Sequence, residues 1–148
     1  MIELDKFIKI FEGLTSAYGQ TVKTDQFSEK GKHKTKSFTI SNPVTKKLWR
    51  EHLEGKDPAL GIVPITKENK CKWGCIDIDT YPFDHKKFIQ KLKQKNIPMI
   101  VCRSKSGGAH AFLFTKDFVP ATVMRVKLKL IASAMGFSGA EIFPKQDY

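Results

Sequence analysis

The sequence predicts an α+β fold, with a mixed but largely antiparallel sheet and helices packed on one face. Three observations lead to this prediction. Amphipathic helical segments alternate with short β-branched runs, two of these runs flank a tight glycine turn, and the 148 residues are 41% hydrophobic. This length and apolar content suit one domain with a real core. Within it, we expect a small helical and basic part over residues 1–59 and a core over residues 60–148.

Four segments are predicted to be helices because their apolar residues recur every three or four positions. These segments are residues 3–14, 43–54, 85–95 and 120–135. Gly13 and Gly136 supply stops after the first and the last of them. For the second helix, Asn42 is a candidate cap and Pro43 suits the first turn.

Five short runs are predicted to be strands from their β-branched and aromatic content. They are residues 60–65, 73–79, 99–104, 111–114 and 141–144. Residues 15–37 are polar, and we expect the Lys-rich stretch 28–36 to form a mobile basic loop. It is either a solvated charge run or an arm that contacts phosphates through Lys32, Lys34 and Lys36.

The charge indicates a polyanionic partner. Lys and Arg number 26 against 15 acidic residues, which gives a formal net charge of +11. Nucleic acid is the first candidate, and a merely soluble basic protein is the alternative. No apolar run approaches the ~18 residues that cross a bilayer, and the N-terminus lacks a signal-peptide layout. Three thinly spread cysteines favour a reduced, cytosolic setting.

Asp77 and Asp79 form the sharpest local feature. Strand alternation puts both carboxylates on one face, about 7 Å apart along the backbone. Two such groups repel each other, and a hard divalent cation such as Mg²⁺ or Mn²⁺ removes that cost. Together with phosphate oxygens, this is an arrangement that phosphoryl transfer uses. The alternative is a strand whose acids pair with lysines at its solvent end.

The turn between the third and fourth predicted strands can bind an anion. Gly107 and Gly108 permit positive φ and close approach to a ligand, and exposed N–H groups in such a turn form an anion-binding nest. The surrounding side chains are basic or hydroxylic: Arg103, Ser104, Lys105, Ser106 and His110. No Gly-Lys-Ser/Thr leads into a helix, so this is not a P-loop. The alternative is an ordinary hairpin turn with solvated basic residues.

Two further sets of residues bear on metal binding. Glu141 opens the last predicted strand and is able to bring a third carboxylate to the acids. The alternative, which Glu141 taken alone favours, is a surface acid at the start of a strand. Cys71, Cys75 and Cys102 lack the two paired arms of a structural zinc site, so we do not expect zinc. Cys75 and Cys102 lie in apolar strands and are expected in the core.

Three motifs, read in order, resemble those of the archaeo-eukaryotic primase or primase-polymerase superfamily. They are DID at 77–79, SGGAH at 106–110 and EIFPKQ at 141–146. The resemblance is closest to the phage and mobile-element branch that includes the primase domain of TOTE systems, where a segment like LGIVPI (60–65) also precedes the first motif. The clear resemblance covers roughly residues 60–146.

This resemblance implies an RRM-like catalytic core in which Asp77, Asp79 and Glu141 hold two Mg²⁺ or Mn²⁺ ions. The family often has Asp at the third position. His110 is implied to contact the phosphates of the incoming nucleotide. The other implied nucleotide contacts are Arg103, Ser104, Lys105, Ser106 and Lys145. The Cys-rich insertion of some relatives is replaced here by the Lys-rich stretch, and the family fold normally continues further, so we expect the chain to be truncated at its C-terminus.

The implied function is template-dependent nucleotidyl transfer by a DNA primase or polymerase that makes or extends primers on single-stranded DNA. The metal ions would align a 3′-oxygen with the α-phosphate of a nucleoside triphosphate. Tyr81 or Phe83 would stack on a base, unless they are core residues. A helicase domain or protein is a further expected partner, with no membrane involved, in the cytoplasm of a bacterial, archaeal or phage-infected host cell. The alternatives are a non-catalytic nucleic-acid-binding module and a metal-dependent nuclease.

Overall fold

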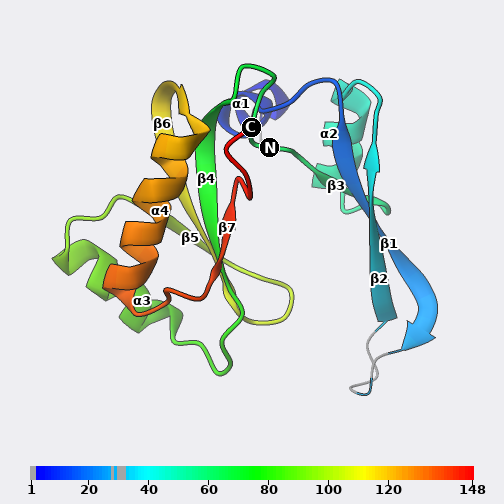
Figure 1. Ribbon diagram of the computed structural model, residues 1–148. Helices are drawn as coiled ribbons and strands as arrows, with labels where there is room; N and C mark the ends of the chain where they lie inside the picture. Colours follow the sequence, from blue (N-terminus) through cyan, green and yellow to red (C-terminus); the bar gives the residue numbers. More distant parts are fainter. Residues whose placement is uncertain (1–2, 28, 30–32) are drawn as a thin grey trace. The chain divides into compact units, whose positions relative to one another are not determined.

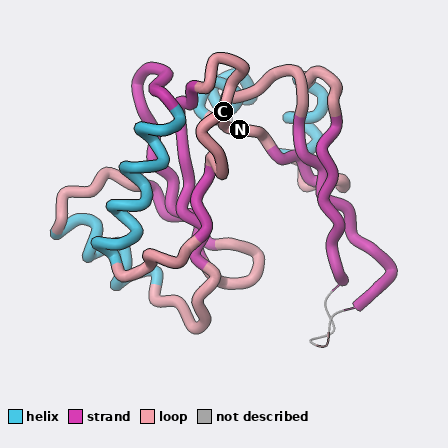
Figure 2. The backbone as a smooth tube through the Cα atoms, in the orientation of Figure 1, coloured by secondary structure: helices cyan, strands magenta, loops and turns pink. Residues whose placement is uncertain are grey.

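The structure is a computed structural model that describes residues 3–27, 29 and 33–148. The chain divides between Val63 and Pro64 into two compact units, each with its own antiparallel sheet (Figures 1 and 2). This combination of helices and antiparallel sheets confirms the predicted α+β class. None of the described helices has the length and apolar character needed to cross a membrane.

The first unit is built around a long β-hairpin. Its elements are α1 (Leu4–Ile10), β1 (Tyr18–Phe27), β2 (His33–Ile40), α2 (Lys46–Leu53) and β3 (Ala59–Gly61). The strands lie in the order β2-β1-β3, and β1 pairs with β2 from Tyr18–Ile40 onward. The segment 60–65, expected to be a strand of the core, instead contributes only its first two residues to β3, which pairs with β1.

The prediction of a loop over residues 28–36 is wrong for residues 33–36, which belong to β2. The hairpin is rich in Thr and other residues that favour strands, and the Thr21 and Ser37 hydroxyls lie 3.0 Å apart across it. Polar side chains occupy both faces, so no alternation of apolar and polar residues marked the strands. Lys32 lies outside the described residues.

The second helix begins later than predicted. Its cap is Thr45, whose hydroxyl oxygen accepts a hydrogen bond from the Leu48 N–H at 3.4 Å. Asn42 and Pro43 precede the helix, because the extended segment before it is fixed by a hydrogen bond from the Val44 N–H to the Thr15 carbonyl at 2.9 Å. The predicted cap at Asn42 is therefore wrong, and a β-region residue directly before the helix takes that role.

The second unit has the element order β-α-β-β-α-β. Its elements are β4 (Lys70–Ile78), α3 (His85–Gln94), β5 (Ile100–Arg103), β6 (Ala109–Pro120), α4 (Ala121–Met135) and β7 (Glu141–Phe143). The strand order is β5-β6-β4-β7, and every pairing is antiparallel. This is the split βαβ arrangement of ferredoxin-like and RRM-like folds. The strands β4 and β6 are longer than predicted.

Helix α4 lies directly on β4 because of a glycine. A Cβ at Gly74 would come within 2.6 Å of Leu128 Cδ1 and 2.8 Å of the Phe143 carbonyl oxygen. Leu128 and Ile76 are almost completely buried in the core beneath the helix. Alternation along β4 sends Ile76 and Ile78 toward this core, and therefore sends Asp77 to the opposite face.

Candidate active site

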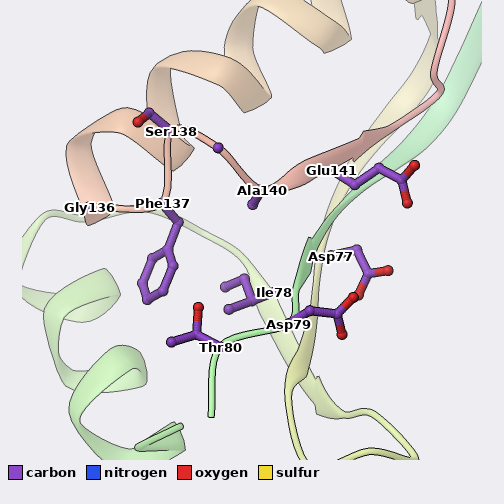
Figure 3. A pocket seen from close by; sticks show the side chains of 10 residues that line it. Asp77, Ile78, Asp79, Thr80, Gly136, Phe137, Ser138, Ala140 and Glu141 are labelled. Atoms are coloured by element: carbon purple, nitrogen blue, oxygen red, sulfur yellow. The ribbon is translucent and has the colours of Figure 1, made fainter. Parts of the chain in front are cut away.

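A row of chemically active side chains crosses the four-stranded sheet. Asp77 on β4 is the register partner of His110 on β6 and of Glu141 on β7. Asp79 follows two residues later on the same face of the sheet. Figure 3 shows the carboxylates of Asp77, Asp79 and Glu141 pointing to the same side. The sheet therefore brings together three acids that come from distant parts of the sequence.

Asp77 is the most enclosed of the three acids. Its side chain is 22% exposed, and His110 Nε2 lies 3.3 Å from its Oδ1. That oxygen is buried and receives no hydrogen bond from the described residues, so the contact has the distance of an ion pair without hydrogen-bond geometry. Burial raises the pKa of the Asp77 carboxyl above its ordinary value. His110 and Lys145 oppose this rise, while Asp79 and Glu141 add to it.

The other two acids are each turned toward a partner of their own. The Tyr81 hydroxyl lies 3.0 Å from Asp79 Oδ1. Lys145 Nζ lies 2.5 Å from Glu141 Oε1 and also sits 5.1 Å from the centroid of the Phe143 ring. With the side chains as they lie, no three acidic, His or Cys groups among the described residues converge closely enough to hold a metal ion.

The chemistry of this donor set nevertheless fits Mg²⁺ or Mn²⁺. Hard divalent ions bind carboxylate oxygens together with phosphate oxygens. Asp77 Oδ1 is a buried polar atom without a hydrogen bond, which is the kind of group that a cation satisfies after a small rotation of the side chain. Like charges on Asp77, Asp79 and Glu141 also repel one another until a cation lies between them.

The glycine turn after β5 is closed by its own backbone. The Ser104 N–H donates to the Gly108 carbonyl, and the Gly107 N–H donates to the Ser104 carbonyl, both at 3.0 Å. Gly107 has φ +96°, which favours glycine. At Gly108, a Cβ would meet the Ile78 carbonyl oxygen at 2.1 Å, so only glycine lets the turn approach the end of β4 this closely.

Side chains also connect this turn to the acids. His85 Nε2 lies 2.9 Å from the Gly108 carbonyl oxygen and therefore donates to it. The Ser104 and Ser106 hydroxyls are 3.2 Å apart, and Ser106 Oγ lies 2.5 Å from the Tyr81 hydroxyl. Of the other predicted nucleotide contacts, Arg103 and Lys105 are exposed in this region.

A pocket of about 450 Å³ opens at the end of β4 beside the acids. Figure 3 shows the residues that line it, which are Asp77, Ile78, Asp79, Thr80, Gly136, Phe137, Ser138, Gly139, Ala140 and Glu141. Sequence reasoning did not identify the loop from Gly136 to Ala140 as a wall of the site. The only signal for it was its position between a predicted helix and the third motif.

Several other predicted residues belong to other elements. Lys34 and Lys36 are on β2 in the first unit. Phe83 packs against Phe88 and Phe137 at centroid distances of 5.4 and 5.8 Å, which supports its interpretation as a core residue. Tyr81 is 52% exposed and reaches the acids through its hydroxyl, a role that sequence reasoning missed.

The cysteines do not form a common site. Burial raises the pKa of Cys71 to about 11. For Cys75 burial, with smaller contributions from Asp77 and Cys102, raises the pKa to about 12. Both thiols are free and buried, whereas Cys102 is exposed, contrary to its expected place in the core.

The chain matches one known protein family. The family model described as the archaeo-eukaryotic primase domain of the TOTE conflict system matches residues 6–148. Among curated proteins, no match to the chain was found. The family match covers both units and includes the acids, the glycine turn and the loop that lines the pocket.

Proposed function

The chain belongs to the archaeo-eukaryotic primase domain family of the TOTE conflict system, and from this premise we propose that it catalyses template-dependent nucleotidyl transfer on single-stranded DNA. A primase-type domain belongs to a family of nucleotidyltransferases whose substrates are, in general, nucleic acid and nucleoside triphosphates. The proposal adds the template, a two-metal mechanism and the residues that carry it. It also adds a cytoplasmic setting and a helicase domain or protein as a partner.

The observation that carries the proposal is the register of β4 with its two neighbours. It aligns Asp77 with His110 and Glu141, which come from three strands and three separate motifs. If Asp77 served only to form an ion pair within the sheet, a second acid directly opposite it, Glu141, would have no purpose. Like charges directly opposite each other destabilise a sheet, so this cost is consistent with a functional purpose.

In the proposed reaction Asp77, Asp79 and Glu141 would hold Mg²⁺ or Mn²⁺. Such ions would lower the pKa of an attacking hydroxyl and neutralise the charge of the leaving pyrophosphate. His110 lies beside Asp77, where it is suited to donate a hydrogen bond to a phosphate oxygen. The pocket beside the acids has room for part of a nucleotide.

The glycine turn is the proposed binding site for the β- and γ-phosphates. Its Ser104 and Ser106 hydroxyls lie together, and Lys105 and Arg103 add positive charge beside them. Charge-assisted hydrogen bonds from such groups both orient a triphosphate and stabilise the charge that develops on transfer. Lys145 is paired with Glu141. If Glu141 instead bound a metal ion, the Lys145 ammonium would be available to bind a phosphate.

The experiment is incubation of the chain with single-stranded DNA, Mn²⁺ or Mg²⁺, and labelled ribo- or deoxynucleoside triphosphates. We expect labelled products that are longer than any primer supplied and depend on both the template and the metal. Asp77→Asn should reduce transfer by at least about 100-fold. Asp117→Asn, which changes an exposed acid on β6, is the matched control and should retain full activity.

Other results would favour the alternative functions. DNA binding without metal-dependent binding of triphosphates in calorimetry would identify a non-catalytic binding module. Shortening of the DNA without any requirement for triphosphates would identify a nuclease. Either result, obtained with wild-type protein whose fold is intact by circular dichroism, would overturn the proposed transfer reaction.

A further inference from the structure

We propose that Tyr81 is a positioning residue. Its hydroxyl links the metal-binding carboxylate of Asp79 to the phosphate-binding turn, so that the geometry of each of these two sites depends on the other. The inference rests on the proposed function, since it takes Asp79 as a metal ligand and the turn as the place of the phosphates. It adds a residue that belongs to neither group and a physical link between them.

The link consists of consecutive hydrogen-bond distances. The Tyr81 hydroxyl lies 3.0 Å from Asp79 Oδ1 and 2.5 Å from Ser106 Oγ. Ser106 Oγ lies in turn 3.2 Å from Ser104 Oγ. A continuous path of oxygen atoms therefore runs from the end of β4 into the turn between β5 and β6.

Tyr81 is not held there by burial. The residue is 52% exposed, so its position does not come from burial in the core. An exposed tyrosine has an alternative in water for each of its hydrogen bonds, yet its hydroxyl meets two protein oxygens. Tyr81 lies in the segment between the end of β4 and the start of α3. His85, at the start of α3, holds the same turn through the Gly108 carbonyl.

The phenol can also transmit a change from one site to the other. It carries one hydrogen, so it donates to one of its two oxygen neighbours at a time. When Asp79 receives that hydrogen, Ser106 is able to donate to the phenol oxygen. A phosphate that takes the Ser106 hydrogen, or a cation that engages Asp79, therefore changes the hydrogen bonding at the other end of the path.

Orientation of a metal ligand by such a partner has a measurable effect. Residues that hydrogen-bond to ligating groups fix their orientation, and their removal typically costs about 10–100-fold in metal affinity. Because His85 still holds the turn, and because Phe keeps the ring, Tyr81→Phe should leave the fold intact. The loss should therefore be confined to the link.

The test is a double-mutant cycle with Mn²⁺ affinity as the readout, measured by calorimetry without any nucleotide. Tyr81→Phe should weaken Mn²⁺ binding by about tenfold. Ser106→Ala should weaken it by a smaller factor, about threefold, although Ser106 is not a proposed ligand. The double variant should bind no more weakly than Tyr81→Phe alone, because both changes break the same path. Tyr148→Phe, at the exposed last residue, is the matched control.

Hydrogen exchange without metal provides the second readout. Tyr81→Phe should speed exchange at the amides of residues 104–108 and leave the core amides of β4 and β6 protected. Unchanged Mn²⁺ affinity in Tyr81→Phe, effects that multiply in the double variant, or unchanged exchange in the turn would each overturn the link while the proposed function stands. Wild-type protein that binds no Mn²⁺ would overturn both.

Discussion

The two sheets of this protein differ in how many of their side chains are buried. In the second unit α4 covers one face of the β5-β6-β4-β7 sheet, and nearly all of the buried apolar residues of the described chain belong to this unit. In the first unit, only Tyr18 and Trp49 are buried among the described residues, and the hairpin residues 25–27 and 34–39 are exposed. The proposed site, which must hold acids in fixed positions, lies on the packed sheet. A strand pair that only presents cations does not need such packing.

The alkylation rates of the cysteines in the second unit test whether its sheet stays packed. A thiol with a pKa of about 12, such as Cys75, is thiolate at only about 1 part in 10⁴ at pH 8. Alkylation at pH 8 should therefore label the exposed Cys102 at least about 1,000 times faster than Cys75. Mass spectrometry of a time course provides the measurement. Comparable alkylation rates at Cys75 and Cys102 would mean that the packed sheet opens readily. The second sheet would then be no better packed than the first.

Truncation of one core residue should have a large effect on the second unit. Leu128 is fully buried against Gly74, so Leu128→Ala should cost about 3 kcal/mol and lower the melting temperature by about 10 °C. The matched control is Leu130→Ala on the same helix, because Leu130 is 63% exposed. That control should change stability by less than about 0.5 kcal/mol. Equal effects in thermal unfolding would contradict the assignment of the inner face of α4.

Charge removal on the hairpin should affect binding and spare the fold. Lys34→Gln combined with Lys36→Gln should weaken single-stranded DNA binding by about tenfold and reduce the salt slope by about 1.4, since each phosphate contact in a single strand contributes about 0.7. Fluorescence anisotropy at several salt concentrations gives both numbers. The control is Lys86→Gln with Lys93→Gln, two exposed lysines on α3. An equal loss of DNA affinity in the control would mean that the hairpin lysines act only through the overall positive charge of the protein.

The smallest expected effect concerns Asp77 in the absence of metal. Because burial raises its pKa, the ionised carboxylate costs stability above that raised pKa, and the cost disappears below the ordinary value. Asp77→Asn should therefore melt about 2 °C above the wild type at pH 7.5 without divalent ions, and this advantage should vanish near pH 3. Asp117→Asn, which changes an exposed acid on β6, is the matched control. A lower melting temperature for Asp77→Asn at pH 7.5 would show that the acid is held by a favourable contact.

The sequence predicted the second unit better than the first. Apolar periodicity located α3, α4, β4 and β6 because each of these elements buries apolar side chains. In the hairpin, both faces of β1 and β2 are polar, so the same method predicted no strand over residues 15–37 and a loop over residues 28–36. The residues of the proposed site could be singled out in the sequence because their types are chemically unusual for a strand. The contacts of Tyr81 could not, since a hydroxyl that joins two loops depends on distances set by the whole unit.

The place of Glu141 on the last strand has a consequence for biosynthesis. A ribosome that has completed β6 must still translate α4 and β7, which takes a few seconds at about 5–20 residues per second. Until then β4 has an open edge, and unpaired strand edges are sites of aggregation. The pairing that adds Glu141 to the acidic row is therefore also the pairing that covers residues 75–77 of this edge.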